Sequence, residues 1–285
     1  MPKPTDHSSR YINTLVKQED RDRYLTAMFA QPGKRAALMG LYAFNVEVAR
    51  ISDTTTESLI GKMKLEWWRD ILSGIYDNKE IPQGNPVVDM LHNIVVSHRL
   101  TRTYFDELLN HREGDMIEEA PSNMLSLEAY AEGTSGHLMW LALEILEVRD
   151  PASLKVARHI GIAWALTGII RAVLFYARNN RNVLPQDLMR ERQLTGLDAF
   201  RRKNADKISE VITEISVVAR HHLDKAKSCH ADVDRKALPA FLLAVLADQY
   251  LQGLAKRGYD IFDPLHAFQR PSVLKLTWSA LRGRY

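Results

Sequence analysis

A basic helix end in the second half of the chain offers groups that can hold an anion. Residues 168–187 read GIIRAVLFYARNNRNVLPQD; they include Arg171, Tyr176 and Arg181, and no carboxylate precedes the last position. Guanidinium groups bind phosphates and carboxylates through paired hydrogen bonds, whereas Mg²⁺ requires oxygen ligands. An Asn-Asn pair separates the two arginines, and asparagine tolerates the left-handed backbone of a tight turn. The stretch predicts a site in which Arg171 and Arg181 converge on one anion.

Two other groups of residues resemble metal ligands but are more typical of ordinary structure. Glu66 and Asp70 are four residues apart, the spacing at which two acids on a helix can share a divalent cation. Basic side chains lie among them, which favours a solvated, salt-bridged face. His221 and His222 are adjacent, so they point about 100° apart on a helix and share no face. The two arginines of the basic helix end have a similar alternative, which is pairing with acids on neighbouring helices.

Composition limits the classes of function. The chain has 285 residues, is 46% hydrophobic and 26% charged, and carries a formal charge of +3. That charge is too small to indicate a nucleic-acid partner. The single cysteine, Cys229, excludes an internal disulfide framework and a cysteine-based zinc cluster. The start has no apolar signal region, and the longest uncharged apolar run, 160–170, is shorter than the ~20 residues of a membrane span. We therefore expect at most peripheral membrane contact.

Apolar residues recur at helical spacing along nearly the whole chain, and no alternating run suggests a sheet. We predict an all-α, single-domain helical bundle over residues 1–285, with a central cavity. Residues 1–18 are expected to form a loosely ordered N-terminal segment. Helices are predicted over 20–29, 34–52, 58–76, 86–98, 101–113, 126–146, 153–176, 197–227, 239–256 and 272–281. Small residues at Gly161 and Gly168 allow another helix or a chain-like ligand to approach the backbone.

Two of these helices resemble the signatures of the squalene/phytoene synthase family, all-α enzymes that join two prenyl diphosphates head to head. The similarity extends over most of the chain. It rests on YAF from Tyr42, LEWWR at 65–69, Arg171 with RNVLPQD from Arg181, and YDIF at 259–262. The resemblance implies an isoprenoid-synthase-like bundle in which helices 42–53 and 161–176 face each other across a mainly apolar cavity.

The acids of the family's metal site are mostly replaced here. In that family each signature helix carries two aspartates four residues apart, and these hold Mg²⁺ against the substrate diphosphate. The matching positions are Ala49 and Asp53 in the first signature, and Ala172 and Tyr176 in the second. One carboxylate of the four remains, and it cannot reproduce a cluster of several Mg²⁺ ions. The resemblance therefore implies a pocket without metal-assisted chemistry.

The pocket implied by this comparison binds a ligand but has no catalytic residue, no metal and no cofactor. A lipid or prenyl phosphate is the expected class of ligand. The alternative is an active prenyltransferase of isoprenoid biosynthesis that uses Mg²⁺ held by Glu66, Asp70 and Asp53. The ligand-binding residues implied for the pocket are Tyr42, Asp53, Arg171, Tyr176 and Arg181.

Three segments resemble one divergent branch of the family, the mitochondrial respiratory complex I assembly factor with this fold and its bacterial relatives. They are AFNVEVA at 43–49, SLIGKM at 58–63 and LALEIL at 141–146. The resemblance implies a non-catalytic or catalytically altered protein that assists complex I assembly, with complex I subunits or assembly proteins as partners. It also implies a location in the cytoplasm or peripheral to the inner membrane of a bacterium, or on the matrix side in a mitochondrion.

Overall fold

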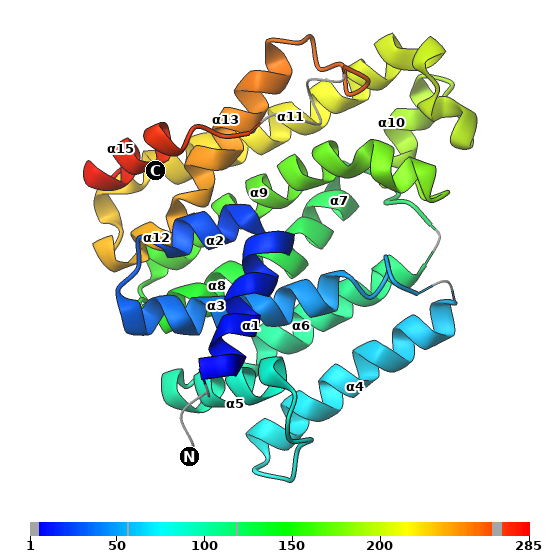
Figure 1. The fold of residues 1–285 in the computed structure, drawn as a ribbon. Coiled ribbons are helices and arrows are strands. Elements are labelled where there is room, and N and C mark those ends of the chain that lie inside the picture. The colour runs from blue at the N-terminus through cyan, green and yellow to red at the C-terminus, as the bar shows by residue number, and fades with distance from the viewer. Residues whose placement is uncertain (1–5, 56, 118, 264–269) are drawn as a thin grey trace.

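The computed structural model describes residues 6–55, 57–117, 119–263 and 270–285, and every regular element in these ranges is helical (Figure 1). This confirms the predicted all-α fold. The main helices are α1 (Asp6–Glu19), α2 (Arg21–Ala27), α3 (Pro32–Ala49), α4 (Ser58–Tyr76), α5 (Pro86–His98), α6 (Arg102–Glu113), α7 (Met124–Ala131), α8 (His137–Ile145), α9 (Pro151–Arg178), α10 (Gln186–Glu191), α11 (Ala205–Ser228), α12 (Leu238–Phe241), α13 (Leu243–Ala255) and α15 (Val273–Leu281).

Local sequence explains where several helices begin. α5 starts at Pro86, and the side chain of Asn85 accepts hydrogen bonds from the first free backbone N–H groups. α9 starts at Pro151 in the same way, with Asp150 Oδ1 accepting from the N–H of Ser153 at 2.8 Å. Proline suits the first helical position because that N–H has no partner within the helix. The predicted bounds of 58–76 and 86–98 are those of α4 and α5.

The 28-residue helix α9 organises one half of the molecule. It packs against α11, α13, α7 and α8, and Figure 1 shows it between α11 and α7. The other half is built on α3, which packs against α1, α5 and α8. By length and composition, Pro151–Arg178 and Arg235–Ala255 could each span a membrane, but 50% and 67% of their apolar windows are buried inside the bundle. Core helices of this kind pass the same test of length and hydropathy.

α9 crosses the π-helical turn Glu132–Gly136 at very short range. A Cβ atom added to Gly161 would lie 2.7 Å from the Cα and 2.9 Å from the N of Gly136. The neighbouring atoms are backbone, so they cannot move aside as a flexible side chain does. Gly161 therefore allows α9 to pack closely against a neighbouring helical turn. This is one of the two roles predicted for it, the other being contact with a chain-like ligand.

Replacing Gly161 by alanine is expected to lower the free energy of unfolding by ~1–3 kcal/mol, because the two backbones must separate. Gly168→Ala is the matched control in the same helix, where the added Cβ meets nothing within 4 Å. Alanine there is expected to stabilise the helix by up to ~1 kcal/mol. Urea unfolding followed by circular dichroism measures both variants. Equal stabilities would contradict the close crossing.

The expectation of a loose N-terminal segment over 1–18 is wrong for the described part of that segment. Residues Asp6–Glu19 form α1, which packs against α3 and α5 and buries Ile12 and Val16. These two side chains are one turn apart on the same face, so a short helix with a polar exterior can still dock on a hydrophobic core. Residues 1–5 lie outside the described residues.

Two further differences concern the segment between α9 and α11. The helix predicted over 197–227 begins at Ala205, because Leu197–Phe200 forms a separate 3₁₀ turn. The side chain of Asn204 donates hydrogen bonds to the carbonyls of Asp198 and Ala199, which holds that turn against the helix start. The short helix α10 was not predicted, since a helix of this length has little periodicity to recognise.

Candidate functional site

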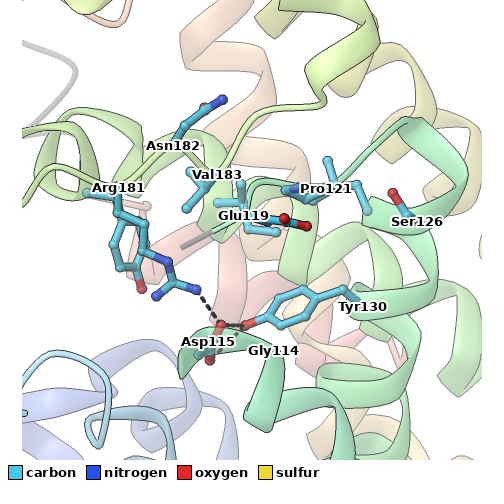
Figure 2. A pocket seen from close by; sticks show the side chains of 12 residues that line it. Gly114, Asp115, Glu119, Pro121, Ser126, Tyr130, Arg181, Asn182 and Val183 are labelled. Carbon is cyan, nitrogen blue, oxygen red and sulfur yellow. Dashed lines mark hydrogen bonds and ion pairs between the residues drawn. The ribbon is translucent and has the colours of Figure 1, made fainter. Parts of the chain in front are cut away.

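A cavity of about 200 Å³ lies beside the C-terminal end of α9 (Figure 2). Apolar side chains from α7, α9 and the segment after α9 form part of its wall, and charged and hydroxyl groups form a polar end. The residues that line it are Gly114, Asp115, Glu119, Pro121, Ser126, Leu127, Tyr130, Ile169, Tyr176, Arg181, Asn182 and Val183. A site of this kind fits a molecule with an apolar body and a polar head.

The end of α9 places Tyr176 and Arg181 together at this polar end. Asn180 has φ +60°, as the Asn-Asn turn predicts, and its N–H donates to the carbonyl of Ala177. The N–H of Arg181 donates to the carbonyl of Tyr176 at 2.9 Å. This pair of hydrogen bonds closes the helix by the usual left-handed cap. The guanidinium of Arg181 consequently lies 5.2 Å from the centre of the Tyr176 ring.

Asp115 is the centre of a hydrogen-bonded network at the same end of the cavity. Its Oδ1 accepts from Nη2 of Arg181 at 2.7 Å and from the hydroxyl of Tyr130 at 2.9 Å (Figure 2). Its Oδ2 accepts from Nη1 of Arg112 at 3.1 Å. The Asp115 side chain is only 7% exposed. A buried carboxylate between two guanidinium groups is stabilised because both of its oxygens are paired.

The protonation states of the neighbouring groups follow from this burial. Burial raises the pKa of Tyr130 and, to a smaller extent, that of Tyr176, so both phenols are neutral near pH 7. Burial opposes the charge of Arg112, but Tyr130 and Asp115 outweigh it and raise its pKa. The polar end therefore contains Arg181 and Asp115, with Arg112 behind them and two neutral hydroxyl groups beside them, and a second acid, Glu119, also lines the cavity (Figure 2).

Asp53 interacts electrostatically with Tyr176 and Arg181, although it is not among the residues that line the cavity. It follows α3 and is exposed, yet partial desolvation raises its pKa and Asp115 acts in the same direction, while Arg181 opposes the rise. The charge of Asp53 also raises the pKa of Tyr176. The segment after α3 thus comes within electrostatic range of the C-terminal end of α9.

Tyr42, by contrast, is a core residue and is not among those that line the cavity. Its ring faces the buried guanidinium of Arg23, which lies 5.8 Å from the ring centres of Tyr42 and Trp164. Arg23 is also paired with Asp20 at 2.7 Å. Tyr42 therefore packs against an internal ion pair and has no surface to offer to a ligand in this cavity.

Arg171 is likewise separate from Arg181. Its Nη1 lies 3.3 Å from Oδ2 of Asp22, and its guanidinium lies 3.8 Å from the centre of the Tyr250 ring. The hydroxyl of Tyr250 donates to Asp22 at 2.9 Å, which completes the group. The expected convergence of the two arginines on one anion is wrong, because each has an acid of its own on another segment. The alternative of pairing with neighbouring acids is the arrangement found.

The side chains at the site do not fit a Mg²⁺ cluster. Three of the four family positions are Ala49, Ala172 and Tyr176, and both oxygens of Asp115 already accept hydrogen bonds. Within the described ranges, no group of three or more His, Cys, Asp or Glu residues is arranged to hold a metal ion. Glu66 pairs with Arg69 at 3.1 Å on α4.

The residues that the sequence analysis missed are Arg112, Asp115 and Tyr130. The sequence does place Arg112 and Asp115 three residues apart at the end of α6. This spacing is common for ion pairs on a helix surface, so it does not by itself indicate a buried site. Tyr130 lies on the next helix, and nothing in its local pattern links it to them. Only the folded arrangement brings all three to the Tyr176–Arg181 cap.

Comparisons with known proteins identify the family of the chain. The squalene/phytoene synthase family model matches residues 16–278. The chain is 33% identical over 261 residues to the Homo sapiens protein "NADH dehydrogenase (ubiquinone) complex I, assembly factor 6", covering 91% of this chain and 77% of that one. The Bos taurus counterpart is 31% identical over 267 residues, covering 94% and 79%. Phytoene synthase 1 of Arabidopsis thaliana is 25% identical over 251 residues, covering 84% and 58%.

A solved structure shows the same fold. The crystal structure of a dehydrosqualene synthase in complex with ligand superposes with a TM-score of 0.81 at 17% identity, covering 97% of this chain and 95% of that one. The resemblance read from the two signatures is confirmed, and so is the isoprenoid-synthase-like bundle. Since the family model covers most of the chain and two relatives exceed 30% identity, the chain belongs to the squalene/phytoene synthase family.

Proposed function

We propose that this protein is a non-catalytic member of the family that assists the assembly of respiratory complex I. The observation that carries the proposal is the replacement of the family's acids by Ala49, Ala172 and Tyr176. A metal-dependent synthase needs those carboxylates to bind the ions that stabilise the departing diphosphate. Similarity to complex I assembly factors over more than 90% of the chain supports the same conclusion. Its partners would be complex I subunits or other assembly proteins.

We further propose that the cavity holds an amphiphile with an anionic head, such as a lipid or prenyl phosphate. Tyr176, Arg181 and Tyr130 present a cation and two hydroxyl groups to the polar end, and apolar side chains line other parts of the wall. Asp115 acts as the internal counterion that keeps Arg112 and Arg181 in place. Tyr42 and Arg171 have no part in this site, because they lie in other clusters. The ligand would serve a structural or regulatory role.

The protein would act in the bacterial cytoplasm or peripherally at the inner membrane, or on the matrix side in a mitochondrion. Complex I is membrane-bound, so a factor that assists its assembly must reach that surface. The apolar windows of Pro151–Arg178 and Arg235–Ala255 are half or more buried in the bundle, which favours peripheral contact over a membrane span.

Deleting the gene in its source organism is expected to lower the NADH:ubiquinone oxidoreductase activity and the amount of assembled complex I on native gels. Succinate dehydrogenase activity serves as the control and should stay unchanged. Re-expression of wild type should restore complex I, and so should Asp53→Asn, because this last acid of the four has no metal to bind. Intact complex I together with loss of a prenyl condensation product would overturn the proposal.

The alternative function is an active prenyltransferase, and membership of the family together with similarity to phytoene synthase favours it. It would need Mg²⁺ held by Glu66, Asp70 and Asp53. Glu66 forms an ion pair with Arg69 on α4, and Asp70 is exposed on the same helix. Asp53 instead lies near the cavity, where its charge raises the pKa of Tyr176. In the deletion strain, failure of Asp53→Asn to restore a lost prenyl product would establish this alternative.

A further inference from the structure

The C-terminal helix α15 has apolar side chains on two different faces. On the inner face, Leu276 is fully buried, and Tyr285 just beyond the helix packs its ring against Phe241 and His230 with centre distances of 4.9 Å each. These contacts hold the helix against the bundle. They account for only one of the two faces, so the other needs a separate explanation.

The outer face of α15 is an exposed apolar stripe. Leu274, Trp278 and Leu281 are 83%, 57% and 77% exposed. Their spacing of four and then three residues places them in one row on the helix surface. Figure 1 shows α15 at the edge of the molecule, at the C-terminal end of the chain. Three large apolar side chains in a row facing solvent are unfavourable in water and indicate a surface that is covered in use.

The C-terminal segment itself supplies only cations to this stripe. No acid follows Asp263 in the sequence, whereas Arg270, Lys275, Arg282 and Arg284 all do. Lys275 and Arg282 lie on one side of the stripe by helical geometry, about 40–120° from its members. The guanidinium of Arg282 lies 4.3 Å from the Trp278 ring centre. The charged side chains that α15 itself places beside the apolar row are therefore cationic, while Asp234 of the preceding segment lines a pocket with Leu281 and Arg282 at the C-terminal end of the row.

A second exposed apolar row provides a contrast. Leu59 and Met63 on α4 are also exposed, but acids and lysines alternate around them, including Glu57 and Glu66. Figure 1 shows α4 and α15 at opposite ends of the molecule. Mixed charge fits a solvated or protein-facing surface, whereas the cations that α15 supplies beside its apolar row fit an anionic partner.

We propose that α15 lies on the surface of an anionic lipid bilayer. Leucines would enter the boundary between headgroups and acyl chains, Trp278 would sit at the headgroup level, and Lys275 and Arg282 would pair with lipid phosphates. α15 would then be the surface through which the protein makes the peripheral membrane contact proposed above. The proposal depends on α15 alone, so its failure would leave the role in complex I assembly and the cavity ligand untouched.

The test is co-sedimentation of the full chain with vesicles of phosphatidylcholine, with or without phosphatidylglycerol. We expect binding to the anionic vesicles and little binding to the neutral ones. Leu274→Ser with Leu281→Ser should weaken binding by about tenfold or more, from the lost apolar burial. Lys275→Gln and Arg282→Gln should each weaken it by about fivefold. Tryptophan emission should shift to the blue on vesicles, and Trp278→Phe should abolish that shift.

Leu59→Ser with Met63→Ser on α4 is the matched control and should leave vesicle binding unchanged. The substituted side chains on both helices are exposed, so circular dichroism and thermal unfolding should match wild type. Equal loss of binding in the α4 and α15 variants would overturn the proposal. So would the absence of vesicle binding in a chain that instead self-associates through α15, seen as a larger mass in light scattering that Leu274→Ser reverses.

Discussion

Replacing Asp115 by alanine is expected to lower the free energy of unfolding by about 3–5 kcal/mol, the range for breaking a buried ion pair from one side. The carboxylate accepts hydrogen bonds from Arg112, Arg181 and Tyr130, and its loss leaves Arg112 charged and largely buried. An unpaired guanidinium in that setting cannot recover its hydration. The polar end of the cavity should therefore lose both stability and geometry.

Thermal unfolding by calorimetry measures this change, with a shift in Tm of about 2–4 °C per kcal/mol for a large domain. Asp198→Ala is the control, since Asp198 and Arg201 form an ion pair with both side chains mostly exposed, and it should cost no more than about 1 kcal/mol. Adding Arg112→Met to Asp115→Ala should recover part of the loss, because it removes the unpaired charge. Equal stabilities for the Asp115 and Asp198 variants would show that the network contributes little.

The second large effect concerns the cavity ligand. Farnesyl diphosphate is expected to bind wild-type protein equally well with Mg²⁺ and with a chelator, and to give no condensation product in either case. Arg181→Ala should weaken binding by about 10–100-fold, the loss of one charge-assisted contact of 1.5–3 kcal/mol. Asp115 keeps two of its partners in this variant, so the fold should persist.

Arg171→Ala is the matched control, because Arg171 pairs with Asp22 and is not among the residues that line the cavity. Its titration curve should match that of wild type. Isothermal titration calorimetry gives the affinities, and chromatography of the extracted lipids detects any product. Product that disappears with the chelator would contradict a metal-free site. Weakening by Arg171→Ala equal to that by Arg181→Ala would place the head group elsewhere.

Local sequence determined most of the helical architecture. The bounds of α4 and α5 could be predicted because hydrogen bonds within a helix join residues four apart, and capping groups such as Asn85 stand next to the helix they begin. The turn at Asn180 was predictable for the same reason. α1 was not predicted, because its sequence is mostly polar and only Ile12 and Val16 are buried where it docks on the bundle.

The family and the missing acids were also readable from the chain. Ala49, Ala172 and Tyr176 occupy positions fixed by spacing within their own helices, so the replacement of three of the four family acids could be read without coordinates. The two signatures predict Asp53, Tyr176 and Arg181 in one pocket; Tyr176 and Arg181 line it, and the charge of Asp53 raises the pKa of Tyr176 from outside the lining.

Only the tertiary structure decided which acid each arginine meets. Arg171 and Arg181 are ten residues apart, yet one pairs with Asp22 near the N-terminus and the other with Asp115 after α6. Ion pairing depends on distance in space and on burial, and neither is encoded in the few residues around a charged group. The chain itself determined the helices and the absence of the metal ligands, whereas the packing of α6, α7 and α9 determined that Asp115 is the centre of the site.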